Sequence, residues 1–182
     1  FLERARLDSL GDGTTVLCAL LEPAERSIHV ANLGDTRCVL GRLPLQHGEA
    51  AKDGECAAVR LSVDHKPNLP EEARRVRGAG GSVRCLQGCW RVVRLAPRRR
   101  STLRTARARR ARLQLALAAA PAAQLGGAGC TTTLAISRAL GDRALKPIVS
   151  CEPSTTSLRL TPRDQFVVLA SDGLWDVLTD EQ

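Results

Sequence analysis

The segment from Phe166 to Val177 runs from an apolar stretch straight into two aspartates. Residues 166–169 favour a buried β-strand, and Gly173 permits a sharp turn of the backbone directly after Asp172. Asp176 follows four positions later. A carboxylate held at the rim of a rigid sheet is a good oxygen ligand for a hard divalent cation. The segment therefore predicts both a core strand and a candidate metal site.

The chain has the size of one domain. Its 182 residues are 43% apolar but only 2% aromatic, so the core must consist of aliphatic side chains. No apolar run approaches the roughly 20 residues of a transmembrane helix, and we expect no association with a membrane. The sequence contains no Met and begins with Phe1, and we therefore expect an internal piece of a longer product.

Seven cysteines form an odd set without a CxxC pair. Most of them lie in apolar stretches, which predicts reduced thiols packed in the core of a cytoplasmic or nuclear protein. Cys85 and Cys89 are the one close pair, and the three histidines do not add the spacing of a zinc site. We therefore expect no structural zinc ion.

Short apolar stretches separated by turn residues predict a series of antiparallel strands. We expect strands over residues 14–21, 27–33, 37–41 and 61–63, a loop over 43–60, and a hairpin over 83–93 that is interrupted at Gly88. A helix begins at Pro70, with Glu71 and Glu72 at its positive end and glycines after it. Strands in series without regular βαβ alternation predict an α+β fold built from packed sheets.

The positive charge of the chain is concentrated in residues 94–133. This stretch holds nine arginines and no Lys, Asp or Glu, so the net charge of +8 falls to −1 for the remainder. Its Ala, Leu and Arg content predicts a helix over 102–120. We interpret 94–133 as a basic low-complexity insert into the domain.

Two origins of the insert remain open. One origin is a basic arm that attracts acidic partners or nucleic acid by charge. The other is intron-derived sequence, and the composition of the stretch favours this second origin. It contains no aromatic residue for base stacking, which argues against sequence-specific binding of nucleic acid. A proteolytic peptide that joins Val93 directly to Leu134 would prove the second origin.

Three aspartates sit at predicted strand ends beside glycine or small residues: Asp35, Asp172 and Asp176. Carboxylate and water oxygens are the ligands that Mg²⁺ and Mn²⁺ prefer. A single aspartate after a strand is more often a turn former or a helix cap than a metal ligand. Spacing alone does not decide between these roles.

The order of six short motifs is more specific than any one of them. Together they resemble the PPM (type 2C) metal-dependent serine/threonine protein phosphatases. The six segments, in chain order, are Asp12–Thr15, Val30–Arg37, Asp64–Pro67, Ala79–Val83, Leu134–Asp142 and Ala170–Val177. The resemblance implies an α+β fold in which antiparallel β-sheets pack as a sandwich with flanking helices, here expected to be incomplete at both ends.

The resemblance also implies a reaction and a set of site residues. Members of the family hydrolyse phosphoserine and phosphothreonine on protein substrates with a water activated by Mg²⁺ or Mn²⁺. Asp172 matches an aspartate of the family's binuclear metal centre. Asp35 and Asp176 match carboxylates associated with a third, weaker metal. The region from His65 to Val83 resembles a mobile flap whose role is substrate choice.

Other family residues are expected to be structural or are missing. Arg138 and Asp142 belong to a family motif, and we expect this pair to organise a loop. The sequence lacks the Asp-Gly-His-Gly-Gly ligand motif, the phosphate-gripping arginine and the late Asp-Asn motif of the family, and no catalytic residue is identified. We therefore expect little phosphatase activity from these 182 residues alone. The alternatives are a non-catalytic, phosphatase-like regulatory module and, more distantly, a basic nucleic-acid-binding protein.

Overall fold

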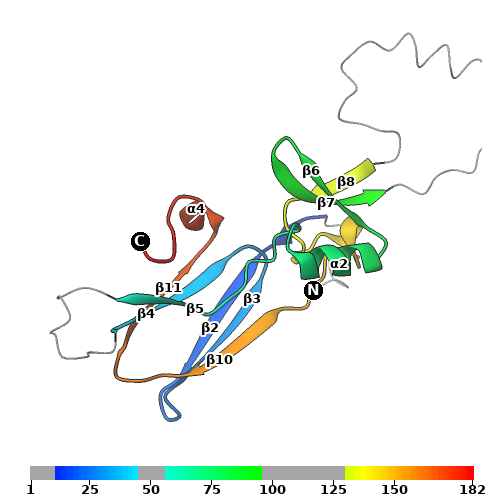
Figure 1. The fold of residues 1–182 in the computed structure, drawn as a ribbon. Coiled ribbons are helices and arrows are strands. Elements are labelled where there is room, and N and C mark those ends of the chain that lie inside the picture. Colours follow the sequence, from blue (N-terminus) through cyan, green and yellow to red (C-terminus); the bar gives the residue numbers. More distant parts are fainter. Residues whose placement is uncertain (1–10, 45–55, 96–129) are drawn as a thin grey trace, which may run out of the picture.

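The structure is a computed structural model that describes residues 11–44, 56–95 and 130–182. Figure 1 shows these residues as small antiparallel sheets with few helices. The strands are β1 (Gly13–Thr14), β2 (Val16–Glu22), β3 (Ser27–Leu33), β4 (Arg37–Arg42), β5 (Ala57–Arg60), β6 (Ser82–Leu86), β7 (Cys89–Leu95), β8 (Cys130–Leu134), β9 (Leu140–Gly141), β10 (Ser154–Arg159) and β11 (Asp164–Ala170). The helices are α2 (Pro70–Gly78), α4 (Asp172–Trp175) and the 3₁₀ turn η1 (Arg143–Leu145).

Two three-stranded antiparallel sheets form the main layers, in the orders β10-β3-β2 and β11-β4-β5. Alternating residues of β3 and β4 meet between them, because successive side chains of a strand point to opposite faces. The buried centre consists of Ile28, Val30, Cys38, Leu40 and Leu61. This packing confirms the predicted α+β sandwich of antiparallel sheets.

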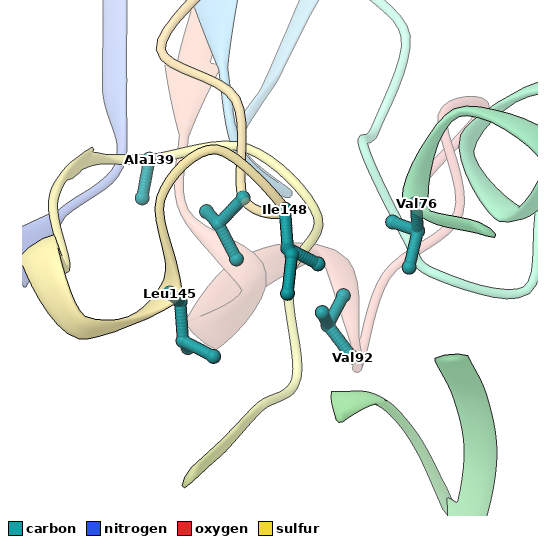
Figure 2. Packing of buried hydrophobic residues seen from close by; sticks show 6 residues of the cluster. Val76, Val92, Ala139, Leu145 and Ile148 are labelled. Atoms are coloured by element: carbon teal, nitrogen blue, oxygen red, sulfur yellow. The ribbon is translucent and has the colours of Figure 1, made fainter. Parts of the chain in front are cut away.

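A second core lies under the helix α2. The sheet β6-β7-β8 and the segment after β8 pack against this helix, and Figure 2 shows their apolar side chains pointing toward one another. The buried members are Val76, Val92, Ala139, Leu145, Ile148 and Val149. The predicted helix from Pro70 and the hairpin interrupted at Gly88 are confirmed.

Two predicted boundaries around β5 are wrong. The loop expected over 43–60 contains the strand β5, which pairs with β4. Residues 61–63, expected as a strand, have no regular strand structure. The physical reason is that side chains take over the hydrogen bonds there: Ser62 Oγ accepts the N–H of Cys38 at 2.8 Å, and Asn32 Nδ2 donates to the carbonyl of Val63 at 2.8 Å.

Several apolar positions are more exposed than the sequence predicts. Phe166 and Leu169, expected in a buried strand, are 54% and 43% exposed, and Leu20 in β2 is 60% exposed. The strands β11 and β2 both lie at edges of the sheets formed by the described residues, so one flank of each has no neighbour.

The expected burial of most thiols is wrong as well. Cys38 is buried, and burial raises the pKa of its thiol to about 11. The thiols of Cys18, Cys85, Cys89 and Cys151 are exposed. Cys85 lies opposite Trp90 and Cys89 opposite Leu86, which puts the two thiols of the close pair on opposite faces of their hairpin.

The ends of the predicted insert belong to a hairpin. Residues 94–95 of β7 and 130–133 of β8 pair in antiparallel register, so both flanks are strand rather than irregular sequence. The remainder of the insert, with the helix expected over 102–120, lies outside the described residues. Within the described ranges, no helix has the length and apolar character needed to cross a membrane.

Candidate metal centre

The turn between β3 and β4 carries Asp35. Asn32, which is fully buried, holds this turn: its Nδ2 donates to the carbonyls of Gly34 and Thr36, and its Oδ1 accepts the hydroxyl of Thr36. Gly34 has φ +117°, and a Cβ there would lie 2.3 Å from the Thr15 side chain. Only glycine fits such a turn without strain, so the position of Asp35 is set by its neighbours.

The helical turn α4 begins at Asp172, and Asp176 directly follows its last residue. The N–H of Asp176 donates to the carbonyl of Asp172 at 2.8 Å, which closes one turn of helix. Side chains four positions apart lie on the same face of a helix, so the two carboxylates share one side of α4. The indole N–H of Trp175 donates to the carbonyls of Arg37 and Ala170, and this anchors the turn to the ends of β4 and β11.

Asp35 and Asp172 come close enough to influence each other. Burial raises the pKa of the Asp35 carboxyl above its usual value, and the negative charge of Asp172 raises it further. The ammonium group of Lys66 acts in the opposite direction. The β3–β4 turn and α4 thus form a site with excess negative charge, in which a cation would be favourable.

Asp176 has a cationic neighbour in the structure. Its Oδ1 lies 3.5 Å from Lys66 Nζ, and both side chains are largely exposed. Among the described residues, no three His, Cys, Asp or Glu side chains converge closely enough to hold a metal ion by themselves. Hence the structure brings Asp35 and Asp172 together but directs Asp176 to a lysine.

The flap region from His65 to Val83 is tied to the loop after β8 through Glu72. This carboxylate is buried and accepts hydrogen bonds from Arg138 (Nε 3.0 Å, Nη2 2.5 Å), Arg75 (Nη2 2.9 Å) and Ser137 (Oγ 2.7 Å). Burial alone would raise the pKa of Glu72, but these hydrogen bonds outweigh it and lower the pKa to about 2.

The expected pair of Arg138 and Asp142 is wrong. Arg138 pairs with Glu72, whereas Asp142 occupies a left-handed turn (φ 48°) after β9 and donates its backbone N–H to the carbonyl of Asp12. Sequence proximity suggested the pair, but the backbone turn at Gly141 directs the two side chains to different neighbours. From the sequence, Glu72 is predicted only as an acidic residue at the positive end of the helix. Its role as the partner of Arg138 depends on a contact between distant parts of the chain.

We predict that the chain loses stability in mild acid because of His65. Burial, followed by the charge of Arg138, lowers the pKa of this imidazole to about 4, and its Nδ1 accepts the N–H of Gly34. The unfolded chain binds the proton near pH 6.5, so stability present above that pH is lost as the pH falls from about 6.5 to 4.

The measurement is urea unfolding at pH 7.0 and 5.5. We expect a loss of about 1 kcal/mol over this interval from His65 alone. The His65→Gln variant keeps an acceptor near Gly34 and should show a flat profile over the same interval. An equal loss in the variant would assign the acid sensitivity to other groups.

The fold and the motifs agree with comparisons to known proteins. The chain belongs to the protein phosphatase 2C family, whose family profile matches residues 3–182. Probable protein phosphatase 2C 12 of Oryza sativa subsp. japonica is 36% identical over 177 residues, covering 97% of this chain and 36% of the rice protein. Probable protein phosphatase 2C 34 of Arabidopsis thaliana is 34% identical over 185 residues, covering 97% of this chain and 39% of that protein.

Solved structures show the same fold. The crystal structure of a serine-threonine phosphatase 2C from Toxoplasma gondii superposes with a TM-score of 0.65 at 24% identity, over 98% of this chain and 47% of that one. The structure of a C. elegans sex determining protein superposes with a TM-score of 0.65 at 24% sequence identity, and the match covers 97% of this chain and 31% of that one. The chain thus spans well under half the length of its curated relatives.

Proposed function

We propose that this chain contributes to a metal-dependent phosphatase that removes phosphate from phosphoserine and phosphothreonine on proteins. The observation that carries the proposal is that Asp35 and Asp172 lie just beyond the same end of the paired strands β4 and β11, within a protein phosphatase 2C domain. Asp35 leads into β4 and Asp172 follows β11, and these two strands are paired along their length. A rigid sheet therefore supports both carboxylates.

The donor chemistry of this site fits Mg²⁺ or Mn²⁺. Asp35 and Asp172 offer carboxylate oxygens; burial, followed by the negative charge of Asp172, raises the pKa of Asp35, and the cation that acts on it, Lys66, has a largely exposed side chain. Asp172 and Asp176 are exposed, so water can complete a coordination shell. Mg²⁺ in particular keeps several waters and needs few protein ligands.

The roles of the residues follow from this fit. Asp35 and Asp172 would hold the cation, and Asp176 would join them once Lys66 releases it. When bound, such cations supply an activated water and neutralise negative charge on the phosphoryl group. The carboxylates of the chain bind and orient, while His65 and Asn32 keep the Asp35 turn fixed through Gly34.

The flap supports a phosphoprotein as the substrate. Glu72 and Arg75 fasten the inner side of α2 to the segment after β8, whereas Arg74 and Arg77 are exposed on the outside. Exposed arginines attract a phosphorylated segment by charge, an effect that weakens with salt. We further propose that the protein works in the cytoplasm or nucleus, where the exposed thiols of Cys85 and Cys89 would stay reduced.

The test is release of inorganic phosphate from a phosphothreonine peptide. It compares the 182-residue chain with any longer product of the same gene, each with Mn²⁺ and with EDTA. We expect Mn²⁺-dependent release from the longer product and near-background release from the 182 residues, because a cation held by two carboxylates lacks the further ligands of a catalytic centre. Hydrolysis that EDTA leaves unchanged would contradict the proposed function. Rapid turnover by the 182 residues would contradict the need for further ligands.

A further inference from the structure

Arg37 connects the strand β4, the start of the flap and the segment after α4. It is the first residue of β4, two positions after Asp35, and its side chain is about nine-tenths buried. Its guanidinium binds Asp64 through Nε (3.1 Å) and Nη2 (2.7 Å), and Nη1 binds Asp180 at 2.6 Å. Asp64 directly precedes the flap, so one side chain joins the sheet, the flap and the segment after α4.

Arg37 also fixes α4 through Trp175. The guanidinium carbon lies 5.1 Å from the centroid of the indole ring, a distance typical of a cation–π contact. The backbone carbonyl of Arg37 accepts the indole N–H at 3.2 Å. Trp175 lies within the turn that bears Asp172 and next to Asp176, so a movement of Arg37 would move that turn.

We infer that Arg37 is a positioning residue for the divalent cation, acting through Trp175 and Asp64 on the carboxylates Asp35 and Asp172. The inference rests on the proposed function, since it assigns a role within the same site. Arg37 sets how far the Asp35 turn and α4 stand apart, and so sets the affinity for the cation.

The contacts need arginine rather than any cation. A guanidinium binds one carboxylate with two parallel N–H groups, reaches a second carboxylate and keeps a flat face for the indole ring. A lysine at this position keeps the charge but offers a single ammonium group. Removing partners that orient metal ligands commonly lowers metal affinity about 10- to 100-fold.

The experiment compares Arg37→Lys with a matched control, Arg42→Lys, in the 182-residue chain. Arg42 is in the same strand and binds Asp164 through two nitrogens, Nε at 2.5 Å and Nη2 at 3.3 Å, but lies at the other end of β4. Mn²⁺ binding is followed by electron paramagnetic resonance. We expect an approximately 10-fold higher Kd for Arg37→Lys and no more than about a twofold change for Arg42→Lys.

A second readout needs no metal. Amide hydrogen exchange over residues 170–178 should be faster in Arg37→Lys than in the wild type and unchanged in Arg42→Lys. Trp175→Phe keeps an aromatic ring but loses the N–H donor, so it should show the same two effects, and it carries the test if Arg37→Lys does not fold.

The outcomes separate the two proposals. If the wild type binds Mn²⁺ and the Arg37→Lys and Trp175→Phe variants bind it equally well, the positioning role is overturned while the proposed function stands. If the wild type does not bind Mn²⁺, the proposed metal site fails. In that case unchanged exchange over 170–178 in the variants overturns the structural part of the inference too.

Discussion

Replacing Glu72 by glutamine should lower the free energy of unfolding by about 3–5 kcal/mol. The carboxylate is 5% exposed and receives hydrogen bonds from Arg138, Arg75 and Ser137. The amide of glutamine replaces one acceptor oxygen with an NH₂ group that faces other donors, and it removes the negative charge that compensates the two guanidinium groups. For a domain of this size the loss corresponds to a fall of roughly 6–20 °C in the unfolding temperature.

Glu71→Gln is the matched control for this prediction. Glu71 is the neighbouring residue in the first turn of α2, is exposed and loses the same charge from the same helix end. We expect it to cost less than about 1 kcal/mol, the usual size of a helix-dipole effect. Thermal unfolding followed by circular dichroism measures both variants. Equal effects would mean that Glu72 acts only through the helix dipole.

Replacing Asp172 by asparagine should remove at least about half of the stabilisation by Mn²⁺ without weakening the metal-free chain. Asp172 and Asp35 repel each other in the absence of a cation, so loss of one charge should leave the metal-free unfolding temperature unchanged or raise it. For the wild type, Mn²⁺ at 100 times its Kd should add about 2.7 kcal/mol. Because the Kd of Asp172→Asn is expected to be at least about 10-fold higher, the same Mn²⁺ concentration should add at most about 1.4 kcal/mol to this variant.

Asp12→Asn controls for a general effect of removing a carboxylate. Asp12 is exposed and also lies near a second aspartate, Asp142, but it directly precedes β1, which pairs with β9. Differential scanning fluorimetry with and without Mn²⁺ compares the three proteins. A Mn²⁺-induced shift that persists in Asp172→Asn, or disappears in Asp12→Asn, would place the metal elsewhere.

Much of the fold could be predicted from local patterns. The strand over 27–33 has the predicted bounds, and the helix begins at Pro70 with glycines after it, because alternation, proline and glycine act over a few residues. The exposure of Phe166 and Leu169 could not be predicted this way. An apolar run indicates a strand, but whether its faces are covered depends on which strands become neighbours.

In the candidate site, too, local motifs predict some residues, whereas other contacts depend on the tertiary structure. The motif order led to Asp35 and Asp172, and the structure brings these two together. The contact between Asp176 and Lys66, the pairing of Arg138 with Glu72, and the central place of Arg37 depend on tertiary contacts across 27 to 143 positions of sequence. No local pattern carries information over such separations.

The most direct measurement is a titration of Mn²⁺ into the wild-type chain and Asp172→Asn, followed by electron paramagnetic resonance. A cation site at Asp35 and Asp172 predicts that the wild type removes the signal of free Mn²⁺ and that added Mg²⁺ restores it. It also predicts that Asp172→Asn binds at least about 10-fold more weakly, because one of two carboxylate ligands is lost. A full signal of free Mn²⁺ in the presence of the wild type, or equal binding by both proteins, would contradict the existence of this site.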